Sequence, residues 1–379
     1  MALVLNEEQR LLQDTARDFL ASNAPVEALR TLRDENDPLG YSAPLWQQMA
    51  EMGWASIILP EAYGGLEFGF VGLGVVLEES GRTLTASPLF ASAVVGASAL
   101  LLGGSEEQKQ SLLPAIAGGE LTLALALEES HHHRPTCIAT TAEQQGDNFL
   151  LNGYKQFVLD GHSADQLIVV ARSSGAESDS EGLSLFLVER ATAGVHCQHN
   201  IMMDSRNAAN IQFDNVVVPA ANVLGQAGEG WKILEPVLDR GRVAIAAEMM
   251  GSALEAFDRT VEYLKEREQF GALIGSFQAL QHRKAHMQSE IELCRSVLLQ
   301  ALSTVDDSPD QLPLLASLAK AKLNDLIKLV TNEAVQMHGG IGVTDELEIG
   351  FFLKRARVAM QIFGDTGYHK DRYATLSGY

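Results

Sequence analysis

The sequence predicts an α+β protein with an N-terminal all-α domain, a central antiparallel β domain and a C-terminal four-helix-type bundle. Apolar residues recur at helical spacing in the first third of the chain and again after about residue 228. The stretch between them carries short apolar runs separated by turn residues. A chain of 379 residues is long enough for two or three compact units. We therefore expect domains at residues 1–120, 121–228 and 229–379.

The first helix is expected to begin after Asn6, whose side chain can cap it, while Glu7 and Glu8 place negative charge in the first turn. The apolar residues that follow lie three or four positions apart, as on one face of a helix. Glycine pairs then punctuate the pattern. The further helices expected in this domain are Ala43–Met52, Phe70–Ser80, Pro88–Leu102 and Ser105–Ala117.

The central domain is expected to consist of short antiparallel strands. The predicted strands are Leu121–Leu127, Ile138–Thr141, Phe149–Leu151, Gln166–Ala171, Ser184–Val188 and Ile211–Val218. Turn residues at 145–148, 152–153 and 173–182 separate several of them. Helical spacing returns after residues 225–230. The helices expected there are Trp231–Arg267, Phe277–Val305, Pro313–Met337 and Glu346–Met360.

The net charge of the chain is strongly negative, with 28 Lys and Arg against 49 Asp and Glu, or −21. Such a chain is repelled by phosphate backbones and anionic lipid, which argues against nucleic-acid and membrane partners. Cys137, Cys197 and Cys294 are too scattered for a disulfide framework or a zinc site, as is typical of a reducing compartment. The first ten residues lack the features of a signal peptide, and no apolar stretch reaches the ~20 residues of a spanning helix. We expect a cytoplasmic protein.

Four segments together resemble the acyl-CoA dehydrogenase family of flavoproteins, and the resemblance covers essentially the whole chain. The segments are Leu-Pro-Glu-Ala-Tyr-Gly-Gly at 59–65, Asn-Gly-Tyr-Lys at 152–155, Arg-Glu-Gln-Phe-Gly at 267–271 with Gly-Ser-Phe-Gln at 275–278, and Gln-Met-His-Gly-Gly-Ile-Gly at 336–342. Each segment alone is a short motif of low specificity. Their occurrence in order and at the family's spacing carries the resemblance.

The third and fourth segments contain residues suited to a dinucleotide. Arg267 can hold phosphate oxygens with two parallel bonds, and Gly339 and Gly340 let main-chain amides approach a ligand closely. Gln278 and Gln336 can both donate and accept. Taken singly, these are also a helix-surface arginine and a loop with two glycines. The resemblance implies that the segments hold the ADP half of FAD across a subunit interface, with a cofactor-binding set of Arg267, Gln269, Phe270, Gln278, Gln336, Gly339, Gly340 and Thr366.

The usual catalytic base of the family is missing. The family's reaction removes a proton next to a thioester and passes a hydride to the flavin, and it needs a carboxylate base. In one familiar arrangement the base lies in a Tyr-Glu-Gly-Thr loop, where this chain has Phe-Gly-Asp-Thr at 363–366 and hence Gly364 in its place. In another it precedes an arginine on the first long C-terminal helix, where this chain has Gly241 before Arg242.

Two acidic residues are candidates to replace that base. Asp365 follows the vacant loop position, and Glu248 shares a helical stripe with Gly241 and Ile245. The resemblance implies that this stripe, together with Arg242, faces the acyl-CoA substrate. A carboxylate among apolar neighbours has a raised pKa, which suits a base. The alternatives are that Glu248 meets a cation at a helix or subunit interface and that Asp365 caps a turn.

The segments that cover the flavin ring in the family differ in this chain. Leu-Glu-Glu-Ser-His-His-His at 127–133 replaces the family's Thr-Glu-Pro-Gly-x-Gly-Ser, and Phe-Val-Leu-Asp-Gly at 157–161 replaces Trp-Ile-Thr-Asn-Gly. Leu127, Phe157 and Leu159 thus stand where ring-binding groups are usual. The three adjacent histidines diverge and cannot easily share a metal ion. We expect the ADP half of the site to be kept, the isoalloxazine half to be degraded, and no metal.

The resemblance implies an FAD-dependent acyl-CoA dehydrogenase that introduces an α,β double bond and passes electrons to an electron-transfer acceptor. The chain looks like the smaller chains of two-gene bacterial dehydrogenases, which act on bulky or dicarboxylic thioesters such as steroid side chains. It is expected to form a homo-oligomer or to pair with a paralogous partner subunit. One alternative is a non-catalytic or half-site subunit that supplies the ADP-binding side of a partner's FAD. Another is a homomeric flavoenzyme that eliminates a leaving group and needs no such base.

Overall fold

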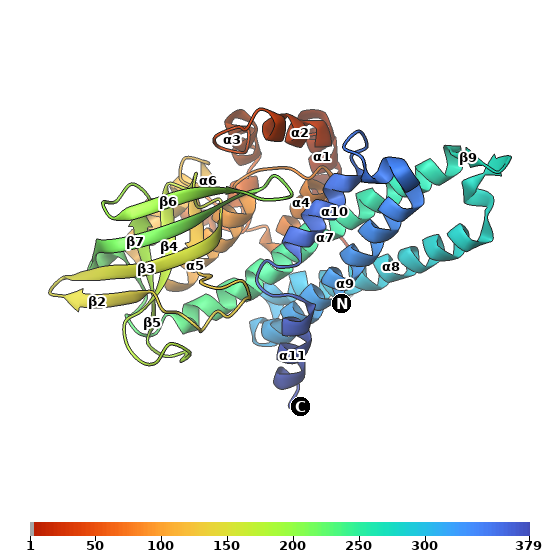
Figure 1. Ribbon diagram of the computed structural model, residues 1–379. Coiled ribbons are helices and arrows are strands. Elements are labelled where there is room, and N and C mark those ends of the chain that lie inside the picture. Colours follow the sequence, from red (N-terminus) through yellow and green to blue (C-terminus); the bar gives the residue numbers. More distant parts are fainter. Residues whose placement is uncertain (1–3) are drawn as a thin grey trace. The chain divides into compact units, whose positions relative to one another are not determined.

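The computed structural model describes residues 4–379 (Figure 1), and the chain divides into two compact units. Unit 1 consists of the chain up to Thr31, Phe70–Thr85 and Arg242–Tyr379, and unit 2 consists of Leu32–Gly69 and Ala86–Gly241. Along the sequence, helices come first, strands next and long helices last. The predicted α+β class and its order of helical, β and helical regions are therefore confirmed. The domain boundaries at 120 and 228 stay predictions.

Unit 1 is helical. Its elements are α1 (Glu7–Asn23), α4 (Gly69–Arg82), the part of α7 (Trp231–Glu266) after Gly241, α8 (Gln278–Asp307), α9 (Leu312–His338), α10 (Ile349–Ala359) and α11 (Thr366–Leu376). The first helix begins as predicted, because Asn6 Oδ1 accepts a bond from Gln9 N at 2.8 Å. Gln9 Oε1 in turn accepts from Asn6 N at 2.9 Å, which completes a capping box.

Within unit 1, α4 and α7 cross with their backbones in contact. A Cβ on Gly81 would lie 2.0 Å from the Glu248 carbonyl oxygen, and one on Gly251 would lie 1.7 Å from the Glu78 carbonyl oxygen. Glycine is required at both positions, because any side chain would overlap the opposing main chain. This crossing buries the middle of α7 and fixes the depth of Glu248 in the unit.

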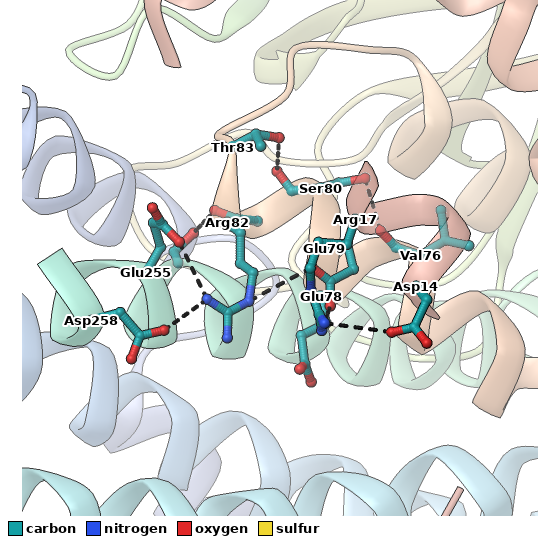
Figure 2. Close-up of polar contacts among 12 residues, drawn as sticks. Asp14, Arg17, Val76, Glu78, Glu79, Ser80, Arg82, Thr83, Glu255 and Asp258 are labelled. Carbon is teal, nitrogen blue, oxygen red and sulfur yellow. Dashed lines mark hydrogen bonds and ion pairs between the residues drawn. The ribbon is translucent and has the colours of Figure 1, made fainter. Parts of the chain in front are cut away.

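Ion pairs tie α1, α4 and α7 together (Figure 2). Arg17 on α1 donates to Glu79 on α4 at 2.8 Å, and the Glu79 side chain is only 1% exposed. Arg82 on α4 contacts Glu255 at 3.2 Å and Asp258 at 3.0 Å, both on α7. These carboxylates therefore hold helices together and are engaged within the chain.

Unit 2 is built on one mixed sheet with the strand order β6-β7-β3-β2-β4-β5-β8 and with β1 beside β4. The strands are β1 (Leu123–Ala126), β2 (Thr141–Gln145), β3 (Asn148–Leu159), β4 (Gln166–Arg172), β5 (Leu183–Glu189), β6 (Val195–Ile201), β7 (Asn207–Pro219) and β8 (Val223–Leu224). Most neighbours are antiparallel as predicted, but β4 runs parallel to β1 and to β2. Phe149 and Phe186 pack edge to face in the core of the sheet at 5.1 Å.

Several helices of unit 2 precede the sheet along the chain. They are α3 (Ala43–Glu51), a π-helix at Leu89–Gly96, α5 (Ala97–Gly103) and α6 (Glu106–Ala117). The single helix predicted over 88–102 is thus a π-helix followed by an α-helix. Ser92 fixes the π-helix to β1, because its Oγ accepts from Leu123 N at 2.9 Å and lies 3.2 Å from Leu123 O.

The sequence pattern misplaces or misses several elements. Ile138–Thr140 is not part of a strand, and Asn152–Gly153 is not a turn but lies inside β3, where the pairing register shifts. The prediction lacks α2 (Val26–Asp34), β6 and α11. β6 is an edge strand with a mostly polar sequence, so it offers no apolar run. No helix within residues 4–379 is both long and apolar enough to cross a membrane.

Candidate functional site

One part of the candidate site lies where α7 ends and a short hairpin begins. β9 (Glu268–Gln269) and β10 (Ala272–Leu273) pair across Phe270 and Gly271, whose φ angles are +54° and +73°. Phe270 is 95% exposed, and its ring meets Phe277 edge to face at 6.3 Å. A large aromatic ring in an unfavourable backbone conformation and open to solvent is typical of a binding residue and not of a core residue.

The second part follows α9. Gly339 has a φ of +65° and ends the helix, which a residue with a side chain would do only under strain. The preceding His338 stacks on Tyr263 of α7 with ring centroids 4.3 Å apart. Tyr263 lies one helical turn before Arg267, and the backbone N–H of Arg267 donates to the Tyr263 carbonyl at 2.9 Å. This contact brings the arginine segment and the glycine segment together, and the sequence prediction did not include it.

The side chains of this group suit a phosphate-bearing ligand. Arg267, Gln278 and Gln336 are exposed, and within residues 4–379 no carboxylate pairs with the Arg267 guanidinium. A surface cavity of about 220 Å³ is lined by Asn332, Val335, Gln336, Gly339, Val343 and Leu353. It is smaller than the ~300–1,000 Å³ of a pocket that encloses a ligand, so it fits part of a larger molecule. An available guanidinium, two amides and uncovered glycine backbone are donors that fit the ADP half of FAD.

Two predicted cofactor residues have contacts of their own within unit 1. Gln269 Nε2 donates to the Glu268 carbonyl at 2.9 Å, and Thr366 Oγ1 lies 3.3 Å from Asp325 Oδ1 on α9. Neither residue lines the cavity beside Gly339. Their roles in cofactor binding stay predictions.

The loop between α10 and α11, where the family resemblance places a base, is held by three buried side chains. Phe363 and Gly364 have φ angles of +55° and +114°. The Phe363 carbonyl accepts from Arg242 Nε at 3.1 Å and lies 3.0 Å from His369 Nε2. The Gly364 carbonyl accepts from Lys320 Nζ at 3.2 Å. Consecutive residues in this conformation persist only where the surrounding contacts impose it.

Lys320, which contacts this loop from α9, has no counterpart among the residues predicted from the sequence. It is fully buried on α9 and also donates to Asn324 Oδ1 at 2.8 Å and to the carbonyls of Ala359 and Met360 at 3.1 and 3.2 Å. Burial lowers the pKa of Lys320 well below its ordinary value. Its local sequence, Ala-Lys-Ala, gives no signal, because most of its partners lie 39 to 44 residues further along the chain.

Position 364 has no room for the carboxylate side chain of a base. A Cβ there would lie 2.6 Å from Tyr368 Cδ1 and 2.8 Å from His369 Nε2. Tyr368 is also held by Arg242, whose Nη2 donates to the Tyr368 hydroxyl at 3.2 Å. Asp365 is the N-cap of α11 and accepts from Tyr368 N at 2.9 Å. The structure therefore gives Asp365 the capping role that the sequence left open as an alternative.

Glu248 forms an ion pair with an arginine, which is the alternative to a catalytic role that the sequence left open. Arg355 Nη1 on α10 donates to Glu248 Oε1 at 3.0 Å, and the two side chains are 2% and 6% exposed. Gly241, Arg242 and Ile245 on the same helix are also buried. Gly241 is the last residue of unit 2, and the other two residues belong to unit 1. None of these residues lines the cavity beside Gly339. The roles of Glu248 as a base and of the stripe as a substrate contact stay predictions.

In unit 2, both acidic residues of the segment that replaces the family's flavin-edge motif have partners within the chain. Lys155 Nζ on β3 is fully buried, lies 2.5 Å from Glu129 Oε1 and donates to the Leu127 carbonyl at 3.1 Å. Glu128 Oε1 lies 2.5 Å from His133 Nδ1. Both acidic residues of the segment are thus engaged inside the chain.

The apolar residues of the two altered motifs are packed into unit 2. Leu127 is 2% exposed and Leu159 is 9% exposed. Phe157 is partly buried at a positive φ of +56°, and its N–H donates to Asn210 Oδ1 at 3.3 Å. The side chains of Leu127 and Leu159 are thus buried, and none of the three side chains can offer a hydrogen bond to a polar ring.

Lys155 makes the stability of the chain depend on pH. Burial lowers the pKa of Lys155 from 10.5 to about 8, against the opposing charge of Glu129. Because the folded-state pKa lies below the unfolded value, the unfolded chain binds this proton more tightly between pH 8 and 10.5. The contribution of Lys155 to the free energy of unfolding therefore rises with pH through that window.

We expect Lys155→Met to remove about 3 kcal/mol of the rise in unfolding free energy between pH 7.5 and 10.5. Urea unfolding of both proteins at several pH values measures this slope. Lys232→Met is the control, since the Lys232 side chain is 71% exposed. Equal slopes for the wild type and Lys155→Met would show that the lysine has an ordinary pKa in the folded chain.

Comparison with known proteins gives matches along nearly the whole chain. The model "Acyl-CoA dehydrogenase, N-terminal domain" matches residues 6–120, and the middle-domain and C-terminal-domain models match residues 125–216 and 228–376. Cyclohex-1-ene-1-carbonyl-CoA dehydrogenase of Geobacter metallireducens is 33% identical over 368 residues, which cover 96% of this chain and 95% of that protein.

Two solved structures are similar over almost their full length. A glutaryl-coenzyme A dehydrogenase in complex with glutaryl-CoA has a TM-score of 0.92 and 28% identity and covers 100% of this chain and 98% of its own. A variant of the Tcur3481-Tcur3483 steroid ACAD has a TM-score of 0.88 and 32% identity and covers 98% of each chain.

Proposed function

The chain belongs to the acyl-CoA dehydrogenase family, and from this we propose that it is a subunit of an enzyme that introduces an α,β double bond into an acyl-CoA thioester. Members of the family are FAD-dependent flavoproteins, and bound FAD supplies the acceptor for the hydride that leaves the β carbon. The proton of the α carbon must pass to a carboxylate base. The protein chain therefore has to hold the cofactor and the thioester and to provide that base.

In this proposal, unit 1 supplies the ADP-binding side of the FAD site. Arg267 pairs with the phosphate oxygens, and the backbone of Gly339 and Gly340 approaches the dinucleotide. Gln278 and Gln336 bond the ribose or adenine. The support is that these side chains are exposed and that Tyr263 and His338 hold the two segments together.

We place the proton-accepting carboxylate on a paralogous partner subunit, so that this chain forms a half-site. The support for this step is the sequence at the positions where the resemblance places the family's base, together with the contacts of the two nearby acids. Gly241 and Gly364 have no side chain, Glu248 is paired with Arg355, and Asp365 caps α11. Glu128 and Glu129 in the altered flavin-edge segment also have partners within the chain, which likewise supports a half-site.

A homomeric enzyme with Glu248 as its base is the second candidate function. A base must accept a proton, and Glu248 is a buried carboxylate whose Oε1 lies 3.0 Å from the Arg355 guanidinium. In this case Arg355 acts by holding the Glu248 carboxylate in position. Asp365 is the weaker candidate, since its side chain is used in the helix cap.

We propose that the substrate carries a bulky, ring-bearing or dicarboxylic acyl group. The names of the relatives support this class: one acts on cyclohex-1-ene-1-carbonyl-CoA, one solved structure is of a steroid ACAD, and another holds glutaryl-CoA. Electrons then pass to an electron-transfer acceptor. The expected location is the cytoplasm.

The proposed function is tested by following flavin absorbance while thioesters of cyclic and dicarboxylic acids are added. The chain is examined alone with FAD and in complex with a co-expressed paralogous chain. We expect bleaching in the complex and none in the chain alone. Bleaching in the chain alone would favour Glu248 or Asp365 as the base, and its absence in both samples would contradict the dehydrogenase proposal.

Introducing glutamate at the vacant loop position is not expected to restore a base. In Gly364→Glu, Tyr368 and His369 have to move aside, which should lower the free energy of unfolding by about 1–3 kcal/mol. Gly367→Glu is the control, since the nearest atom to a Cβ there is Asp365 Oδ1 at 3.4 Å. Urea unfolding measures the loss. A stable Gly364→Glu variant that bleaches FAD with acyl-CoA would contradict this account of the loop.

A further inference from the structure

Three N–H donors converge on one carboxylate in unit 2. Lys155 Nζ lies 2.5 Å from Glu129 Oε1, and Thr140 N donates to the same oxygen at 3.1 Å. Ala139 N donates to Glu129 Oε2 at 2.6 Å. Two consecutive backbone N–H groups and an ammonium thus bond both oxygens of the carboxylate, as in the sites that bind free anions.

The donors are positioned by contacts that do not involve Glu129. The guanidinium of Arg172 on β4 donates to the carbonyls of Thr136 at 2.9 Å and Ile138 at 3.1 Å. The backbone N–H of Arg172 donates to the Thr140 carbonyl at 2.8 Å. Lys155 is fully buried within β3 and donates to the Leu127 carbonyl. The frame that holds the three donors therefore does not depend on the carboxylate that occupies it.

Arg172 also fixes the opposite side of this frame. Its guanidinium donates to the carbonyls of Ser174, Glu177, Asp179 and Glu181 at 2.8–3.3 Å. The loop 173–182 is thereby fastened to residues 136–140. A single buried cation that bonds carbonyls from both segments keeps the backbone N–H groups of Ala139 and Thr140 in place.

We propose that Lys155 Nζ and the N–H groups of Ala139 and Thr140 form an oxyanion-binding site whose internal occupant is Glu129. A free carboxylate or phosphate group binds there when the Glu129 carboxylate is absent. In the wild-type chain the tethered carboxylate has an effective concentration in about the millimolar range or above, so it excludes free anions at lower concentration. Glu129 then acts as a built-in blocking group at the segment that stands where the family has its flavin-edge motif.

The occupant is recognised by charge and shape. The three N–H groups can donate to any anion that carries at least two oxygens on one atom. A carboxylate and a phosphate both meet this condition. Glu129→Ala removes the internal carboxylate and leaves Lys155 beside the space that it filled. Glu129→Gln fills the same space with a neutral group and leaves no room for a second one.

The test is anion rescue of Glu129→Ala, followed as the midpoint of thermal unfolding at constant ionic strength with sodium chloride as the balancing salt. Acetate and inorganic phosphate are added separately. We expect acetate to raise the midpoint saturably by about 2 °C or more, with no such effect on Glu129→Gln. Glu143→Ala, an exposed glutamate on β2, should not respond.

The double variant Glu129→Ala with Lys155→Met should lose the rescue, because the ammonium is one of the three donors. If Glu129→Ala folds only in the presence of an anion, the midpoint of thermal unfolding cannot be compared without anion. The yield of refolded protein is then measured as a function of acetate concentration instead. Rescue by acetate alone assigns a carboxylate site, and rescue by phosphate as well assigns a general oxyanion site. No response of midpoint or yield to either anion overturns the proposal.

Discussion

Replacing Glu248 by glutamine is expected to lower the free energy of unfolding by about 3–5 kcal/mol, because the buried Arg355 guanidinium loses the charge of a carboxylate that it bonds at 3.0 Å. If Glu248 is instead the base, flavin reduction or substrate binding is abolished and the fold stays intact. Urea unfolding and stopped-flow reduction of the same protein separate the two. Glu262→Gln is the matched control, since that glutamate on α7 is 63% exposed.

A double variant sharpens the Glu248 experiment. Replacing Glu248 and Arg355 together by leucine removes both buried charges, so it should be less destabilising than the loss of Glu248 alone. Unchanged stability of Glu248→Gln, combined with loss of flavin reduction in the assembled enzyme, would instead make Glu248 the base. Asp365→Asn should have the smaller effect, because an asparagine still caps α11.

Replacing Arg267 by alanine is expected to weaken FAD binding by about 1.5–3 kcal/mol, or roughly 10- to 150-fold in dissociation constant. The reason is the loss of a charge-assisted bond to phosphate from a guanidinium that has no carboxylate partner within residues 4–379. Titration followed by flavin fluorescence measures the change, in the chain alone and in its complex. Arg10→Ala, at an exposed arginine on α1, is the control. Equal affinities of the wild type and Arg267→Ala would remove Arg267 from the site.

The helices with strong apolar patterns and the β region could be predicted from the sequence, because their periodicity reflects burial of one face or of whole runs. α9 and α8 were expected within a few residues of their observed bounds. β6 could not be predicted from the sequence, since an edge strand with mostly polar side chains shows no apolar alternation. The parallel pairing of β4 with β1 and β2 depends on the sheet as a whole and leaves no local signal.

The candidate site was predictable in its motifs and not in its contacts. The segments around Arg267 and Gly339 are identified by their resemblance to motifs of the family, but the stacking of Tyr263 on His338 that joins them is not predicted. The partner of Glu248 lies 107 residues away along the chain, so the ion pair with Arg355 leaves no signal in the local sequence. The same holds for Lys320, which no local pattern marks.

The half-site proposal is tested most directly by the amount of FAD bound per chain, measured by absorbance after denaturation of the purified protein. For the chain alone the account predicts a value well below one FAD per chain, because both acidic residues of the flavin-edge segment have partners within the chain and its apolar residues offer no bonds to the ring. With a paralogous partner it predicts about one FAD for each pair of unlike chains. A value near one FAD per chain for the protein alone, with flavin bleaching by an acyl-CoA, would contradict it and show a complete enzyme.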